Sequence, residues 1–279
     1  MWVFLLDPTN AAALGEPEVR RAVAAAVASD APERRIPGTL VAGRGRIAAV
    51  VPALSQTLTE GSGEAVDRAA LALVRIQDRD AEPNLRAAVD RQMKQGGARL
   101  PVIQALAVAA TGRSGAPAAG WASAATGELR RWAWIVVAAS GDTSAHTELM
   151  TALQSALTPS GELADACALA QALKSASTLA DEAALRTAFA TAAPTAVCPP
   201  ISVRDLPWRE LKGAPPMLIA NEELLRERLM IAFFNIAAPA TIDWLSGILD
   251  DVKQPLPVRH RAERLLKLLE GAPARLPRQ

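Results

Sequence analysis

The residues that could carry chemistry are few and widely spaced in this sequence. It contains two histidines, His146 and His260, and two cysteines, Cys167 and Cys198. His260 lies between two arginines on the polar side of a predicted helix, and His146 lies near a predicted helix start, so we expect both to be solvent-exposed. Neither has a nucleophile or a set of metal ligands at a matching spacing. The sequence therefore predicts no catalytic residue and no metal site.

One glycine-rich run, Gly43-Arg44-Gly45-Arg46, has the composition of a phosphate-binding loop. It follows no predicted strand, and the chain contains no glycine-lysine-serine or glycine-lysine-threonine sequence. We interpret the run as a flexible basic loop and predict no cofactor site. Acid pairs such as Asp250-Asp251 are adjacent in sequence, so they point to different helix faces and suit solvent or capping better than acid–base catalysis.

The two cysteines do not make a disulfide framework. Cys167 lies on a predicted helical stripe with Leu163, Ala170 and Leu173, so we expect it to be a small buried hydrophobic residue. A disulfide with Cys198 is the less favoured alternative, because disulfides are rare in the reducing compartment predicted below.

Composition and periodicity favour helices as the elements that position all these residues. Tyrosine is absent, phenylalanine occurs four times, and valine and isoleucine do not alternate in strand-like runs. Apolar residues instead recur at helical spacing. Helical segments are predicted over residues 17–29, 47–77, 82–95, 100–110, 121–139, 162–175, 181–192, 221–237 and 241–271, with a loop rich in proline, glycine and arginine over 30–46. A further helix, capped by Gly141-Asp142-Thr143, is predicted from Leu149, Leu153 and Leu157 at helical spacing.

The stretch from 194 to 216 departs from this pattern. It holds six prolines and Trp208, and shows no helical stripe. We favour a long connection that runs across the surface. The alternative is a partner-binding insertion with Trp208 as its anchor, because tryptophan is enriched at binding hot spots.

A short motif opens several of the predicted helices. It reads Pro257-Val258-Arg259 near the C-terminus, Pro17-Glu18-Val19-Arg20 near the N-terminus and Pro83-Asn84-Leu85-Arg86 between them. Val19 and Leu85 are 66 residues apart, and Leu85 and Leu185 are 100 apart, which are close to multiples of about 33, a period within the range of helical repeats. A leading helix, an acidic turn and this motif resemble a HEAT repeat, in particular the short HEAT-like type found in bacteria.

The resemblance implies an all-α fold, an irregular right-handed α-solenoid of antiparallel helix pairs. Within one continuous domain, we expect residues 1–193 to form an N-terminal HEAT-like array and 194–216 a proline-rich connection. Residues 217–272 would then form the C-terminal helices, ending in a capping hairpin at 241–271.

Charge and hydropathy limit the classes of partner. The formal net charge of +1 gives no general electrostatic case for nucleic acid or an anionic membrane. The longest strongly apolar run, Trp132–Ala139, is too short to span a bilayer, and the N-terminal Met1–Leu6 is too short for a signal-peptide core. We therefore predict a cytoplasmic chain without membrane insertion.

Helical repeat arrays bind partners along extended surfaces. The resemblance therefore implies a non-enzymatic scaffold or adaptor that binds a protein partner, with no cofactor. The residues predicted to contact that partner are Trp208, Arg209, Arg204, Arg130 and Arg131.

A nucleic-acid function is the alternative. HEAT-like alkylpurine DNA glycosylases use a basic concave face with aromatic and acidic residues, and here Arg130 and Arg131 lie beside Trp121, Trp132 and Trp134. The strongly apolar helix around them favours a core role for these tryptophans, so nucleic-acid binding is the less favoured prediction. A HEAT-like lyase or chaperone is a third class, for which no residue gives support.

Overall fold

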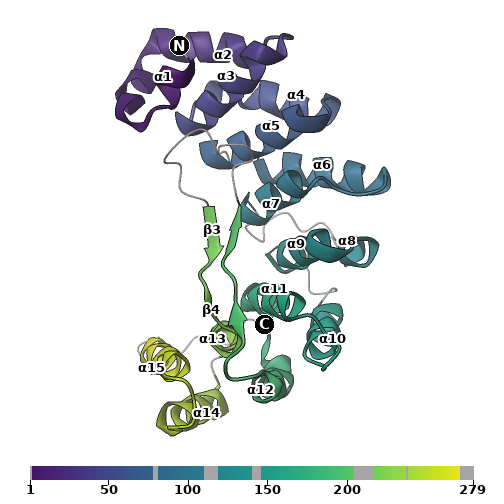
Figure 1. Cartoon of the computed structure of the whole chain (residues 1–279), viewed down its shortest axis with the longest axis vertical. Helices are drawn as coiled ribbons and strands as arrows, with labels where there is room; N and C mark the ends of the chain where they lie inside the picture. Colours follow the sequence, from purple (N-terminus) through teal and green to yellow (C-terminus); the bar gives the residue numbers. More distant parts are fainter. Residues whose placement is uncertain are drawn as a thin grey trace. The chain divides into compact units, whose positions relative to one another are not determined.

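The computed structural model describes residues 2–77, 81–109, 119–139, 146–203, 217–236 and 238–270. The chain is mostly helical, with two short pairs of strands (Figure 1). It divides into two compact units. Unit 1 consists of Met1–Ser114, Ala124–Trp132 and Ser202–Ile219, and unit 2 consists of Gly115–Ser123, Ala133–Ile201 and Ala220–Gln279.

Unit 1 is built from helices that pack on their neighbours along the chain. Its elements are α1 (Trp2–Leu6), η1 (Pro8–Gly15), α2 (Pro17–Val27), α3 (Pro32–Arg44), η2 (Ala48–Val50), α4 (Val51–Glu60), α5 (Gly63–Ile76), α6 (Ala81–Lys94) and α7 (Leu100–Ala109). Helix α2 packs on α3, α4 on α5, and α6 on α7. In addition α3 packs on α5, α5 on α7, and α4 on α6, so each pair contacts the next pair along the chain.

The predicted hairpin at 47–77 is confirmed as η2, α4 and α5. Pro52 lies in the first turn of α4, where its missing N–H removes no helical hydrogen bond. Leu54 and Leu58 of α4 are buried, as are Val66, Ala70 and Leu73 of α5. Gly61 and Ser62 separate the two helices, and Gln77 ends α5 in the left-handed region, with a φ of 60°.

The loop predicted over residues 30–46 is wrong, because Pro32–Arg44 forms helix α3. Its glycines serve close packing rather than flexibility. A Cβ atom on Gly38 would lie 2.8 Å from the Cβ of Ala26 in α2, and one on Gly43 would lie 3.0 Å from the Cα of Ala72 in α5. Local helix propensity is poor here, and tertiary contact overrides it.

Side chains also connect successive pairs of unit 1. Asn84 donates to the Ser55 hydroxyl at 2.9 Å, across 29 residues of sequence. Arg99 makes a two-pronged ion pair with Asp67, with N–O distances of 2.6 and 2.5 Å, across 32 residues. Arg91 of α6 donates to the Leu58 and Thr59 carbonyls, so it caps the C-terminal end of α4.

Unit 2 contains the later pairs. Its elements are α10 (His146–Ala156), α11 (Leu163–Ala176), η4 (Leu179–Asp181), α12 (Glu182–Thr191), β1 (Val197–Cys198), β4 (Glu223–Leu224), α13 (Leu225–Ala232), η6 (Phe233–Asn235), α14 (Pro239–Asp250) and α15 (Leu256–Glu270). Helix α10 packs on α11, α12 on α13, and α14 on α15, while α13 packs on both α11 and α15. Helices α8 (Ala119–Ala124) and α9 (Gly127–Ala139) contribute residues to both units.

The C-terminal hairpin is confirmed as α14 and α15, with one error in its predicted stripe. Val252 is 79% exposed, because α14 ends at Asp250 and leaves this residue in the turn. Trp244 packs edge-on against Phe189 and contacts Phe233, with ring centroids 5.1 and 4.4 Å apart. The surrounding core consists of Phe189, Met230, Leu245, Ile248, Val258, Ala262, Leu265 and Leu266.

The strands lie where the sequence predicted other structure. Strand β1 pairs antiparallel with β4, with Val197 opposite Leu224 and Cys198 opposite Glu223. Strand β2 (Ile201–Val203) pairs with β3 (Met217–Ala220). The connection predicted over 194–216 therefore contains regular structure in its described part, and the helix predicted over 221–237 begins only at Leu225. Two-residue strands are too short for an alternating pattern to reveal them.

Helix remains the dominant structure, so the coarse prediction of helical class is confirmed. The apolar helix predicted over 121–139 is divided into α8 and α9, with Gly127 at a positive φ of 55° between them. Trp121, Trp132 and Trp134 are buried, as expected for core residues. Among the described helices, none combines the length and the hydropathy needed to cross a bilayer.

Candidate functional site

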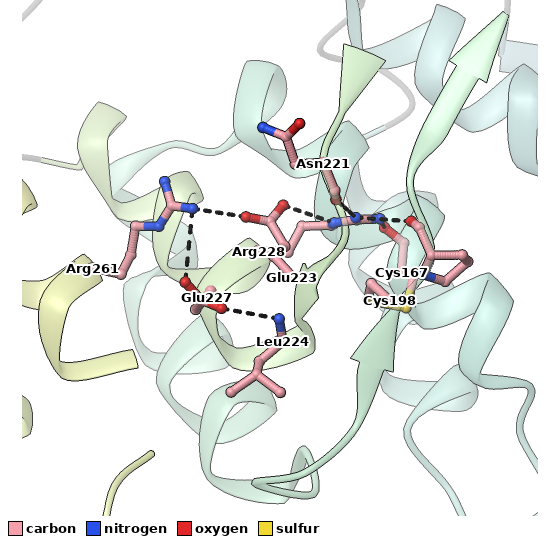
Figure 2. Close-up of polar contacts among 9 residues, drawn as sticks. Cys167, Cys198, Asn221, Glu223, Leu224, Glu227, Arg228 and Arg261 are labelled. Carbon is pink, nitrogen blue, oxygen red and sulfur yellow. Dashed lines mark hydrogen bonds and ion pairs between the residues drawn. A yellow bond between two sulfur atoms is a disulfide. The ribbon is translucent and has the colours of Figure 1, made fainter. Parts of the chain in front are cut away.

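The most elaborate polar site in unit 2 surrounds Arg228 of α13, whose side chain is fully buried. Its guanidinium donates from Nε to Glu223 Oε1 at 3.1 Å and from Nη2 to the Asn221 carbonyl at 2.7 Å. Nη2 also reaches the Pro199 carbonyl at 3.1 Å, and Nη1 reaches the Cys167 carbonyl at 3.5 Å (Figure 2). A buried guanidinium requires such partners, because an unpaired charge in the interior costs several kcal/mol.

Glu223 joins this arginine to a second one. Its Oε2 accepts from Arg261 Nη2 of α15 at 2.8 Å, so the carboxylate lies between two guanidinium groups (Figure 2). Arg261 is also 3.9 Å from Glu227 Oε1, and Glu227 Oε2 accepts the backbone N–H of Leu224 at 3.0 Å. Burial lowers the pKa of Arg228, and the hydrogen bond and charge of Glu223 oppose that shift. The guanidinium remains charged at any physiological pH.

A disulfide adjoins this group. Cys167 of α11 is bonded to Cys198 of β1, with an S–S distance of 2.04 Å and a Cα–Cα distance of 5.6 Å. Cys167 is buried, as predicted, but its expected state as an unbonded cysteine is wrong. The partners are 31 residues apart, and Cys198 lies in the proline-rich stretch whose structure the sequence did not reveal. Their proximity is therefore a tertiary property. Together these residues form the Arg228 cluster, which consists of Cys167, Cys198, Pro199, Asn221, Glu223, Glu227, Arg228 and Arg261.

Within the Arg228 cluster, the charged groups bond to one another and to backbone carbonyls. The Arg228 guanidinium and both Glu223 oxygens are therefore engaged within the cluster. The cluster attaches the chain to helices α11, α13 and α15 at two points, near Pro199 and near Asn221. The chemistry that it supports is attachment and positioning of the strand segment.

The predicted partner-binding residues are only partly placed. Trp208, Arg209 and Arg204 lie outside the described residues. Arg130 and Arg131 are half-buried on α9, and each already interacts with another group of the chain. The structure therefore assigns no shared site to these five residues.

His146 departs from the expected exposed position. Its Nε2 is 2.8 Å from Asp181 Oδ2, and its side chain is mostly buried. The same carboxylate oxygen accepts from the Thr178 backbone N–H at 2.6 Å and from its hydroxyl at 2.8 Å. Since the hydroxyl donates to the aspartate and not to the imidazole, the three residues do not form a nucleophile–base–acid relay. His260 is exposed on α15, as predicted.

Unit 1 carries a groove where α2 turns into α3 and α4 turns into α5. Its volume is about 370 Å³, and Asp30, Arg35 and Glu60 are the charged residues that line it. The Nε of Arg35 is buried and has no hydrogen-bond partner among the residues that the structure describes. Glu60 accepts a hydrogen bond from Gln56 at 2.9 Å. The groove therefore combines a guanidinium with two carboxylates, which suits polar contacts of mixed charge.

No group of three or more histidine, cysteine, aspartate or glutamate side chains within the described ranges is arranged to hold a metal ion.

The sequence matches no protein-family model, and a search of curated proteins finds no similar sequence.

Proposed function

We propose that this chain is a non-enzymatic scaffold or adaptor, an irregular right-handed α-solenoid of HEAT-like helix pairs that binds a protein partner on its surface. The observation that carries the proposal is the repeated contact between successive pairs in unit 1. Asn84 and Ser55 are separated by 29 residues, Arg91 and Leu58 by 33, and Arg99 and Asp67 by 32. Bonds at nearly constant separation are what stacked repeats of about 33 residues would make.

The packing of helices in each unit gives further support. In unit 1, α5 packs on α3 and α7, and in unit 2, α13 packs on α11 and α15. Each of these central helices thus contacts the second helix of the preceding and following pairs. Repeat arrays are stabilised by such neighbour contacts and present long surfaces to their partners.

The Arg228 cluster supports a binding role for the segment between β2 and β3. A disulfide and a buried arginine attach the chain before β2 and after β3. Positioned attachments of this kind are typical of elements that must present residues in a defined place. We therefore propose Trp208, with Arg204 and Arg209, as partner contacts, because tryptophan and arginine are the commonest binding hot spots. Arg130 and Arg131 are proposed as secondary contacts.

Site-specific photocrosslinking tests this function. A photoreactive amino acid replaces Trp208 in the full chain, and the matched control carries it at Arg264, which is exposed on α15. We expect one protein to crosslink from position 208 and not from 264. With that protein purified, W208A should weaken binding about 30-fold, equivalent to about 2 kcal/mol for a hot spot, whereas R264A should change it less than about twofold.

Two results would contradict the scaffold proposal. One is equal crosslinking from both positions, and the other is a purified partner whose affinity is unchanged by W208A. DNA binding that weakens with salt and with R130A/R131A would favour the alternative of a HEAT-like DNA-binding protein or glycosylase.

A further inference from the structure

Two short arms of chain in unit 2 are held by different kinds of link. The first arm, residues 196–201, contains β1 and Cys198, and the second arm, residues 220–224, contains β4 and Glu223. The arms pair through Val197–Leu224 and Cys198–Glu223. The far ends of the arms, Ile201 and Ala220, lie in the second pair of strands, β2 and β3. Both ladders are short, so the ladders alone are a weak attachment.

The second arm is attached mainly by charge-assisted bonds. Glu223 accepts from Arg228 at 3.1 Å and from Arg261 at 2.8 Å, and the Asn221 carbonyl accepts from Arg228 at 2.7 Å. Glu227 accepts the N–H of Leu224 at 3.0 Å. These links reach α13 and α15, and none of them involves sulfur.

The first arm depends on the disulfide. Cys198 is bonded to Cys167 in the middle of α11. Its described polar contacts to other elements are the Pro199 carbonyl with Arg228, at 3.1 Å, and the Ala196 carbonyl with the N–H of Leu225, at 2.8 Å. If the S–S bond were broken, these two hydrogen bonds and the two short ladders β1–β4 and β2–β3 would remain.

We propose that Cys167–Cys198 is a redox latch for the first arm. With the disulfide formed, the arm is fixed on α11. With two thiols, the first arm detaches from α11, while the second arm stays attached through Glu223 and Arg228. The latch responds to dithiol reductants, either small molecules or dithiol proteins.

The reduction is a balanced two-electron exchange. One thiolate of the dithiol attacks a sulfur of the disulfide, the S–S bond breaks, and a mixed disulfide forms. The second thiolate of the reductant displaces the remaining cysteine thiolate, and two protons convert the products to the thiols of Cys167 and Cys198. The reductant leaves as an intramolecular disulfide.

Burial controls access to the latch. Cys167 is 2% exposed and Cys198 is 0% exposed, so a reductant can reach sulfur only after the first arm has opened locally. Reduction is therefore expected to be slower than for a solvent-exposed disulfide. In a reducing compartment, disulfides usually act transiently and sense redox state, which is consistent with this role.

Hydrogen exchange on the full chain tests the latch. Protein with and without dithiothreitol is compared by mass spectrometry, after alkylation has established the number of free thiols. On reduction, exchange of the backbone N–H groups of Val197, Cys198 and Ile201 should rise at least about tenfold more than that of α15. The N–H groups of residues 220–224 should follow α15. The double variant C167S/C198S should match the reduced protein and should not respond to dithiothreitol.

Three results would overturn the proposal. The first is two free thiols in protein that has never been exposed to reductant. The second is equal protection of the first arm before and after complete reduction. The third is that reduction removes all protection of α15 from hydrogen exchange. The disulfide would then stabilise the whole of unit 2 and not the first arm alone. If the double variant does not fold, the comparison of oxidised and reduced wild-type protein still decides among these outcomes.

Discussion

In unit 1, two glycines let neighbouring helices pack closely, whereas in unit 2 three helices are joined through a buried arginine, its carboxylate partner and a disulfide. Gly38 and Gly43 leave no room for a Cβ beside α2 and α5. Helices α11, α13 and α15 of unit 2 instead meet around Arg228, Glu223 and the Cys167–Cys198 bond. Because the two units use similar helix pairs, the helices themselves do not explain why unit 2 needs a buried arginine and a disulfide.

The reason is the strand segment that unit 2 must hold. A helix satisfies the hydrogen bonds of its own backbone. Two helices need only apolar faces and small residues to pack closely. The arms at Pro199 and Asn221 end short strands, so their carbonyls need donors from elsewhere, and Arg228 supplies them. Arg228 of unit 2 is thus buried where strands interrupt the helix packing, whereas the buried ion pair Glu82–Arg86 of unit 1 lies within a single helix, α6.

Removing the buried guanidinium should have the largest effect. Arg228→Met leaves the carbonyls of Asn221 and Pro199 without donors and removes one of two cations from Glu223. We expect unit 2 to lose about 3–5 kcal/mol of unfolding free energy. Urea titration followed by hydrogen exchange in α13 and α5 measures each unit separately.

The matched control is an arginine of unit 1. Arg99 pairs with Asp67 but is 44% exposed, so Arg99→Gln should cost only about 0–1 kcal/mol. Equal losses of unfolding free energy for the two variants would mean that burial of the guanidinium does not set its contribution to stability.

Two glycine substitutions should have effects of opposite sign. Gly38→Ala places a methyl group 2.8 Å from the Cβ of Ala26, so α2 and α3 must separate, and unit 1 should lose about 1–3 kcal/mol. Gly247→Ala in α14 enters open space and should stabilise unit 2 by about 0.5–1 kcal/mol through helix propensity. Thermal unfolding of both variants is the measurement. A stabilising G38A would show that the close approach in unit 1 is not a packing constraint.

Arginine capping should affect the two units alike. Arg91 donates to the last carbonyls of α4 in unit 1, and Arg259 donates to the Leu249 carbonyl of α14 at 2.8 Å in unit 2. Replacing either by glutamine should cost about 1 kcal/mol, since each loses a charged donor to a partly solvated carbonyl. Denaturant midpoints compare them. A loss of stability in only one unit would indicate that arginine capping does not stabilise both units.

The smallest effect is expected from a turn of unit 2. Hydrogen bonds from the Gln254 side chain and the Lys253 backbone hold the pKa of Asp251 below its usual value. The carboxylate therefore stabilises the α14–α15 turn above the unfolded pKa of about 3.9, and this contribution is lost as pH falls through the lower folded pKa. NMR titration should place the carboxyl below its usual pKa in wild type. A normal pKa would show that the turn does not hold the charge.

Prediction from the sequence worked best where structure is local. The hairpins at 47–77 and 241–271 have apolar residues at helical spacing, and both fold as helix pairs. It failed for Pro32–Arg44, where poor helix formers are compensated by contact with α2 and α5. It also missed β1 and β4, whose two residues each carry no periodic signal.

The candidate site could not be predicted in the same way. Arg228 lies in a helix that was predicted from its apolar residues, and no local sequence pattern distinguishes this arginine from an exposed one. Cys167 was correctly expected to be buried, but its bond to Cys198 depends on how α12 and the following strand return the chain to α11.

By itself, the sequence determined the helical class, most helix positions and the apolar faces, because helical hydrogen bonds and side-chain periodicity depend on residues three and four positions apart. The tertiary structure alone decided which arginines are buried, which cysteines are bonded and which glycines permit helix contact. Those properties depend on residues about 30 or more positions apart, or on the distance between two backbones, and no local pattern records them.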